Sequence, residues 1–168
     1  MIEMKLRENA MSSLHEGLIC WKQAQDGDQS RYKFAILHIS HFFELALKAV
    51  VYDMHPLLVY KQPASKNLYD AMTITPQEAF YIIKNSVENS MGGIEFDEDE
   101  IQPLIRLKKV RNAIEHFVYD LSPKEIKEDI VLFLETVSSM ASDRADMSFA
   151  DDLDDVAMAI YDDLFESV

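Results

Sequence analysis

Apolar residues recur along the chain at spacings of three and four, which is the pattern of amphipathic helices. The alternation of apolar and polar residues that marks strands is absent, and glycine occurs only four times in 168 residues. The spacing predicts helices over about 8–25, 30–53, 75–91, 98–117 and 122–140. We therefore expect an all-α fold, an up-and-down bundle of about five helices with an acidic C-terminal helix after it.

The second predicted helix is the most apolar part of the chain. Its run AILHISHFFELALKAVV is apolar on nearly every side, which is typical of a helix packed centrally among others. His41, Glu44 and Lys48 interrupt this run at spacings of three and four, so they form a thin polar stripe on one face. The pattern predicts a core helix that carries a few polar groups into the bundle.

Two helix starts carry clear local signals. Thr75 is a suitable N-cap with Pro76 at the first helical position. Ser122 and Pro123 repeat this arrangement, and Glu125 is available to complete a capping box. These residues predict sharp N-termini for the third and fifth helices.

The C-terminal segment is acidic and amphipathic. Its apolar positions, which can share one side of a helix, are Phe149, Leu153, Val156, Ile160 and Leu164. We interpret residues 1–145 as the helical bundle and residues 146–168 as an acidic amphipathic helix or tail. Such a helix docks either on its own bundle or on a partner.

The chain carries a formal charge of −14, which argues against a protein that coats nucleic acid through clustered Lys and Arg. Residues 143–168 hold nine acids and one base, which leaves 21 acids and 15 bases, or −6, in residues 1–142. Within that remainder lies a basic cluster, Arg106, Lys108, Lys109 and Arg111. It is either a solvated helix face or a contact for phosphate.

Several classes of protein lose support from what the sequence lacks. Cys20 is the only cysteine, so an intrachain disulfide or a Cys-based zinc site is excluded, and its apolar surroundings favour a buried structural thiol. No GxGxxG, Walker, GxSxG or HExxH motif is present. No uninterrupted apolar run approaches a membrane span, and the N-terminal residues do not resemble a signal peptide. We expect a cytoplasmic protein with no membrane association and no cofactor.

A metal site on the second helix is a weak alternative. His38, His41 and Glu44 have helical spacing and could share a metal, but a second helix would have to supply the remaining ligands. A histidine in an apolar helix is more often a hydrogen-bonded core residue. The sequence therefore favours no metal.

The segment RNAIEH, residues 111–116, concentrates the groups that phosphodiester cleavage needs. Arg111 offers a permanent charge whose fork matches phosphate oxygens. His116 titrates near neutrality, so it can take the proton of a ribose 2′-hydroxyl or give one to the leaving oxygen. Asn112 lies one turn before His116, so its amide can orient the imidazole or a phosphate.

Helical geometry sets a condition on this interpretation. Arg111 and His116 are five residues apart, about 140° around a regular helix, so they do not share one face. A surface ion pair between Arg111 and Glu115, with His116 capping helix carbonyls, explains the spacing equally well. Catalysis would need a helix that ends within the motif, or a second chain related by a twofold axis.

Taken together, these features resemble the HEPN superfamily. Its ribonuclease members share a helical bundle and an Arg motif with a polar residue next and a His four to six positions beyond the Arg. RNAIEH fits this motif with Asn112 in the polar position. Glu44 and Lys48 match the Glu and Lys of an apolar helix in the family. The likeness spans about residues 8–142.

The resemblance implies metal-independent RNA cleavage at a site formed across a homodimer, which leaves a 2′,3′-cyclic phosphate. Arg111 would hold the phosphate and His116 would be the general acid or base. Asn112 would assist, and Glu44 would be either an orienting group or only the ion-pair partner of Lys48. The neighbouring residues that would contact RNA are Arg106, Lys108 and Lys109.

Toxin and defence roles are common in this family. The expected partners are therefore RNA, a second copy of the chain, and an antitoxin or other protein. The acidic tail departs from the family pattern, and it would either cover the basic cluster as a mimic of nucleic acid or bind a separate protein. The alternative function is a non-catalytic HEPN-like module that recruits a protein through its acidic C-terminal helix.

Overall fold

A computed structural model describes residues 5–64, 67, 71–88, 98–116, 122–145 and 147–166. In chain order the elements are α1 (Leu6–Gln25), α2 (Arg31–Met54), the 3₁₀ turn η1 (Pro56–Val59), α3 (Pro76–Glu88), the 3₁₀ turn η3 (Glu98–Ile101), α4 (Gln102–His116), α5 (Pro123–Ala145), α6 (Phe149–Asp152) and α7 (Asp155–Glu166). The predicted all-α bundle is confirmed. In these ranges the only strand-like pairing is one isolated antiparallel bridge, between Tyr60 and Thr73.

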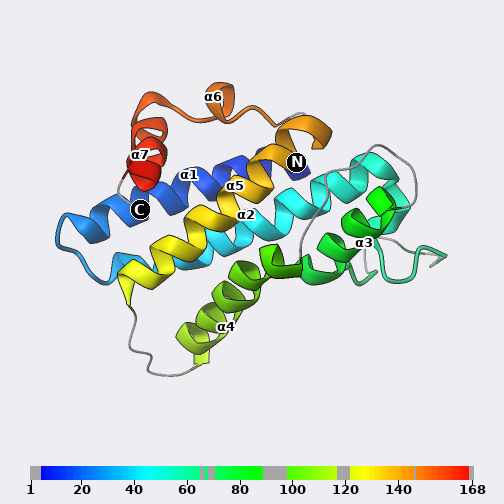
Figure 1. Cartoon of the computed structure of the whole chain (residues 1–168), viewed down its shortest axis with the longest axis horizontal. Coiled ribbons are helices and arrows are strands. Elements are labelled where there is room, and N and C mark those ends of the chain that lie inside the picture. Colours follow the sequence, from blue (N-terminus) through cyan, green and yellow to red (C-terminus); the bar gives the residue numbers. More distant parts are fainter. Residues whose placement is uncertain are drawn as a thin grey trace.

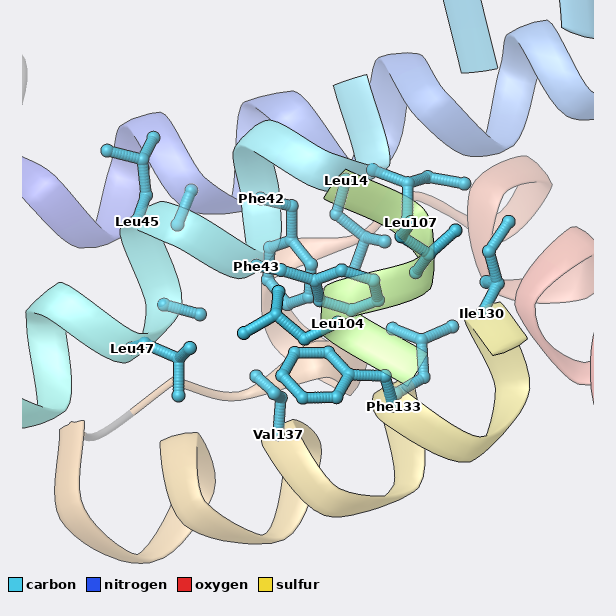
Figure 2. Packing of buried hydrophobic residues seen from close by; sticks show 14 of the residues in the cluster. Leu14, Phe42, Phe43, Leu45, Leu47, Leu104, Leu107, Ile130, Phe133 and Val137 are labelled. Carbon is cyan, nitrogen blue, oxygen red and sulfur yellow. The ribbon is translucent and has the colours of Figure 1, made fainter. Parts of the chain in front are cut away.

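Helix α2 lies at the centre of the bundle because almost all of its faces are apolar. Helices α1, α3, α4 and α5 and the turn η1 all pack against it. Figure 1 shows α1, α2 and α5 alongside one another, with α4 on the lower side of these three helices in this view. Figure 2 shows Phe42 and Phe43 of α2 packed among Leu104 of α4 and Phe133 of α5. The rings of Phe43 and Phe133 meet edge to face at 4.6 Å between centroids.

The apolar character of α2 is used for packing. By length and composition alone the helix is apolar enough to cross a membrane. Yet 67% of its most apolar 18-residue stretch is buried inside the bundle. A core helix covered on every side has the same composition as a membrane span. Cys20 on α1 is buried as well, and its burial raises the pKa of the thiol.

Most helix boundaries lie within two residues of those predicted. The third helix was expected to reach residue 91, but the structure describes α3 only to Glu88. Helix α5 extends to Ala145, five residues beyond its predicted end, because Met140 and Ala145 are buried in the core and extend its packed face. Ser122 caps α5 as predicted, with its Oγ accepting a hydrogen bond from the backbone N–H of Glu125 at 3.5 Å.

The acidic tail forms two helices where one was predicted. Leu153 is extended (φ −100°, ψ 141°) and ends α6, and Asp154 Oδ1 accepts a hydrogen bond from Ala157 N at 2.8 Å, which starts α7. Because of the break, residues before and after Leu153 do not follow one continuous helical spacing. The prediction that Val156 lies on the apolar side was therefore wrong, and this residue is 60% exposed. The buried positions of α7 are Ala157, Ile160 and Leu164.

The tail docks on its own bundle, against α1 and α5. His15 Nε2 of α1 lies 3.0 Å from Asp154 Oδ2, and the hydroxyls of Ser138 on α5 and Tyr161 on α7 are 3.1 Å apart. Figure 1 shows α7 and α4 on opposite sides of the three long helices. The tail therefore does not cover the basic cluster of α4.

The close approach of α1 and α2 depends on Gly17. A Cβ at this position would lie 2.6 Å from Ile39 Cγ1 and 3.2 Å from the backbone N of Ile39. The backbone atom belongs to a helix that is held on several sides, so it cannot easily move away. A side chain at this position would therefore force the two helices apart.

We expect Gly17→Ala to lower the free energy of unfolding by about 1–3 kcal/mol, because the added methyl overpacks the interface between α1 and α2. This loss outweighs the gain in helix propensity, which is up to about 1 kcal/mol. Urea denaturation followed by circular dichroism measures the change. Ser12→Ala, at an exposed position of the same helix, is the control and should shift the value by less than about 0.5 kcal/mol. A midpoint unchanged by Gly17→Ala would contradict the close packing.

Candidate functional site

A pocket of about 240 Å³ lies between α2, α4 and the segment that leads into α3. Its main polar lining residues are Ser40, Glu44, Lys48, Thr73, Arg111 and Asn112. Three of these, Glu44, Arg111 and Asn112, are candidate site residues from two distant parts of the sequence. The fold therefore brings together Glu44, Lys48, Arg111 and Asn112, four of the residues on which the resemblance to a known family depended. The side chain of the fifth, His116, lies outside the described residues.

Glu44 lies between two cations in this pocket. Lys48 Nζ donates a hydrogen bond to Glu44 Oε1 at 2.6 Å, and Arg111 Nη1 lies 3.8 Å from Glu44 Oε2. Lys48 is only 7% exposed. A buried ammonium is stable only with close, hydrogen-bonded partners, and Glu44 supplies the counter-charge beside Lys48. The ion pair with Lys48 that the spacing suggested is present, and the other carboxylate oxygen of Glu44 faces Arg111.

Thr73 completes the surroundings of Lys48. Its Oγ1 accepts a second hydrogen bond from Lys48 Nζ, at 3.0 Å. The antiparallel bridge with Tyr60 holds Thr73 in place, and it is extended by a hydrogen bond from Ile74 N to Val59 O at 2.9 Å. Backbone hydrogen bonds thus tie the segment before α3 to residues 59–61, and the side chain of Thr73 joins it to α2.

The N-terminus of α3 forms another wall of the pocket. The backbone N–H of Thr75 donates to Glu78 Oε2 at 2.6 Å, and Thr75 Oγ1 accepts from Glu78 N at 3.2 Å. This is a complete capping box, and Lys61 Nζ adds an ion pair with Glu78 at 3.2 Å. The hydrogen bonds from Thr75, followed by the contact with Lys61, lower the pKa of Glu78 to about 2.

The basic cluster is divided between two faces of α4. Lys108 and Arg111 line the pocket beside α2, whereas Arg106 and Lys109 line the opposite side, toward α5. Arg106 Nε donates to Asp129 Oδ1 of α5 at 2.7 Å, so its guanidinium is engaged in an ion pair. Of the residues expected to contact RNA, only Lys108 lies at the pocket.

His116 is the last residue of α4, but its side chain lies outside the described residues, as does that of Glu115. The ion pair expected between Arg111 and Glu115 is therefore not described. The guanidinium of Arg111 lies beside Glu44 of α2.

His41 is a further acid–base group close to this pocket. Its Nδ1 lies 3.0 Å from Ser13 Oγ of α1. Burial lowers the pKa of His41, the negative charge of Glu44 opposes this shift, and Arg111 reinforces it. The sequence placed His41 on the polar stripe of α2 but gave no sign of its hydrogen bond to α1.

Metal binding gains no support from the described part of the chain. Within it, no three His, Cys, Asp or Glu side chains come together in a way that could hold a metal ion. This applies to His38, His41 and Glu44, whose helical spacing suggested a metal site. The pocket instead combines three cations, Lys48, Lys108 and Arg111, with one carboxylate, a local balance of +2 in a chain of −14.

No protein-family model matches the chain, and searches of curated proteins and of solved structures found no match. Function is therefore inferred from the chemistry of the pocket and from the resemblance in its residues. The pocket has the charge and the hydrogen-bond donors that suit an anionic ligand. Its walls come from a core helix, a capped helix start and a bridged segment, all of which are held by backbone hydrogen bonds.

Removal of Glu44 and removal of Lys48 should change the free energy of unfolding by different amounts. We expect Glu44→Ala to lower the free energy of unfolding by about 3 kcal/mol, because it leaves a buried ammonium without its counter-charge. Lys48→Met should cost less than about 1.5 kcal/mol, because Met fills the volume of the lysine stem and Glu44 still faces Arg111. Urea denaturation of both variants makes the comparison. Equal losses, or a larger loss for Lys48→Met, would contradict this arrangement.

The capping box at α3 should make the free energy of unfolding depend on pH in the acidic range. Because the pKa of Glu78 is lower in the folded chain, its contribution is fully present above its ordinary pKa and is lost as the pH falls toward about 2. In Glu78→Gln, the free energy of unfolding should fall less steeply with decreasing pH over that window. Urea titrations at a series of pH values test this, with Glu125→Gln at the cap of α5 as the matched control. Parallel pH profiles for the wild type and Glu78→Gln would rule out this role.

Proposed function

We propose that this chain is a metal-independent endoribonuclease of HEPN type whose active site is the pocket between α2 and α4. The observation that carries the proposal is that Glu44 of the core helix lines the same pocket as Arg111 and Asn112 of the RNAIEH motif. The alternative in which Arg111 is merely a surface residue is weakened by its position beside a carboxylate of the core helix. The proposed substrate is single-stranded RNA, and the proposed location is the cytoplasm.

The electrostatics of the pocket support a phosphate ligand. Lys48 and Glu44 are tied to each other, while Lys108 and Arg111 are one turn apart on α4 and face the same side. Cations fixed in a partly enclosed site act more strongly on a bound anion than the same charges do in water. The pocket therefore offers charge where the negative charge of a phosphorane would develop.

The proposed reaction needs no metal or cofactor. The ribose 2′-oxygen attacks phosphorus, a bond forms between them, and the bond to the 5′-oxygen breaks, which leaves a 2′,3′-cyclic phosphate. Arg111 stabilises the charge on the phosphorane, and Asn112 orients the phosphate. His116 moves a proton, either from the 2′-hydroxyl or to the departing 5′-oxygen. Glu44 positions the guanidinium.

A homodimer belongs to this proposal because Arg111 and His116 diverge by about 140° around a regular helix. A twofold axis beside α4 would bring His116 of one copy toward Arg111 of the other. An antitoxin or another protein partner would then act by blocking the pocket or the dimer.

The competing proposal is a module that recruits a protein through the acidic C-terminal helix. Three apolar positions of α7, Ala157, Ile160 and Leu164, are buried against its own bundle, so they are not available to a partner in this arrangement. Besides its carboxylates, α7 exposes one large apolar side chain, Val156, so it offers few of the apolar anchors that usually carry affinity at an interface. We therefore favour the nuclease.

Cleavage of single-stranded RNA in excess EDTA tests the proposal. We expect the wild type to cleave and to leave cyclic phosphate ends. Arg111→Lys should lower the rate about 10²- to 10³-fold, because a point charge replaces the fork that matches phosphate oxygens. His116→Ala should lower it about 10²- to 10⁴-fold. Arg106→Lys is the matched control, because Arg106 lies on the same helix but faces α5, and it should cleave like the wild type.

Each variant is first shown to unfold at the urea concentration of the wild type, so that a lost fold is not taken for a lost group. A contaminating nuclease would give equal rates in all four preparations, which would sink the proposal. No cleavage by the folded wild type, or cleavage that EDTA abolishes, would also overturn it.

A further inference from the structure

The pocket has apolar walls that the binding of a phosphate alone would not require. Besides the polar residues, part of its lining is apolar and is formed by Ile74, Leu104, Ile105 and Leu107. A phosphate does not gain from apolar walls, because its oxygens seek hydrogen-bond donors. The pocket therefore has room and surface for an uncharged, largely apolar group attached to an anion.

Ser40 supplies an independent sign that the pocket takes a ligand with a polar atom. It lines the pocket and is 8% exposed, and its Oγ is buried without a hydrogen-bond partner among the described residues. A buried hydroxyl without a partner costs about 1–3 kcal/mol, so such groups are rarely kept without a reason. A polar atom of a ligand in the pocket would supply the partner that this hydroxyl lacks.

The size of the pocket limits what it can hold. At about 240 Å³ it is slightly smaller than the pockets of about 300–1,000 Å³ that take drug-sized ligands. It is equivalent to about eight water molecules at ~30 Å³ each. One planar ring system fits this size, whereas a longer piece of polymer does not.

The polar groups around the apolar walls suit the edge of a nucleobase. Among them, Gln77 lines the pocket from the first turn of α3. A carboxamide both donates and accepts, which allows it to pair with a base edge, and its bidentate partner among the bases is adenine.

Along α4 the lining changes from apolar to cationic. Leu104 and Leu107 come first, and Lys108 and Arg111 follow toward the C-terminal end of the helix. From Leu104 to Arg111 the helix rises by about 10 Å, so a ligand lying along α4 would meet the apolar walls and the cations at different ends. A nucleotide has this division, with a planar base at one end and a phosphate at the other.

We propose that the pocket is a subsite for one nucleotide, which holds a base splayed out of single-stranded RNA between α2 and α4, with its phosphate at Lys108 and Arg111. Recognition of unstacked bases is the usual way in which proteins read RNA sequence. The inference rests on the proposed function, since it makes this nucleotide the one whose phosphate is attacked. It adds a preference for adenine at that position.

Isothermal titration calorimetry of the full chain with the four nucleoside 3′-monophosphates and with inorganic phosphate tests the inference. We expect adenosine 3′-monophosphate to bind most tightly and inorganic phosphate at least tenfold more weakly. Ser40→Ala should weaken nucleotide binding about two- to tenfold, which corresponds to one hydrogen bond. The same variant should be at least as stable as the wild type in urea, because it removes an unpaired buried hydroxyl. A purely structural role for Ser40 would give the opposite result, lower stability with unchanged affinity.

Two adjacent lysines provide a matched control for the phosphate end. Lys108 lines the pocket, whereas Lys109 lies on the face toward α5, and both side chains are exposed. Lys108→Ala should weaken nucleotide binding and reduce its dependence on salt, while Lys109→Ala should leave both unchanged. Equal effects of the two substitutions would mean that the phosphate does not lie at the pocket.

The outcomes separate this inference from the proposed nuclease. RNA cleavage without nucleotide binding, or equal binding of all four nucleotides and of phosphate, overturns the base subsite and leaves the nuclease standing. Nucleotide binding that depends on Ser40, without RNA cleavage, supports the subsite and rejects the nuclease. Failure of both binding and cleavage rejects both.

Discussion

The structure depends on covering α2, a helix that is apolar on nearly every side. Its neighbours α1, α3, α4 and α5 are needed to remove that surface from water, and Gly17 lets the first of them approach closely. The polar stripe of α2 sets a second condition. Because burying the ammonium of Lys48 would cost several kcal/mol on its own, the fold must supply Glu44 and Thr73 beside it. The pocket lies where this stripe meets α4, so one helix determines both the core and the candidate site.

Much of this could be predicted from local patterns. The stripe on α2 and the capping residues Thr75 and Ser122 depend on spacings within one helix, and they lie where the spacing placed them. The partner Thr73 could not be predicted, because a single backbone bridge in an irregular segment holds it, and such a bridge leaves no periodic signal. The break at Leu153 was not predicted either. Asp154 was counted with the acidic face of a continuous helix, although Asp is also a strong N-cap.

Closeness in sequence was a poor guide to closeness in space on α4. Each residue turns a helix by about 100°, so Arg106 and Arg111 diverge by about 140°, as Arg111 and His116 do. The basic cluster is therefore split, with Arg106 bound to Asp129 of α5 and Arg111 beside Glu44 of α2. The divergence of Arg111 and His116 is the physical reason why a second copy of the chain belongs to the nuclease proposal.

The net charge of −14 acts on an approaching ligand differently from the charges of the pocket. At physiological salt, charges are screened over about 8 Å, less than the diameter of one helix, ~10 Å. Helix α7 docks on the far side of the long helices from α4, so its aspartates are separated from the pocket by packed helices. They slow the encounter with a polyanion but barely weaken an anion already in the pocket. A molecule with a small cationic pocket on an acidic surface is suited to a single exposed nucleotide and poorly suited to the long phosphate backbone of a duplex. This balance of charges favours the same ligand as the apolar walls and the unpaired hydroxyl of Ser40 do.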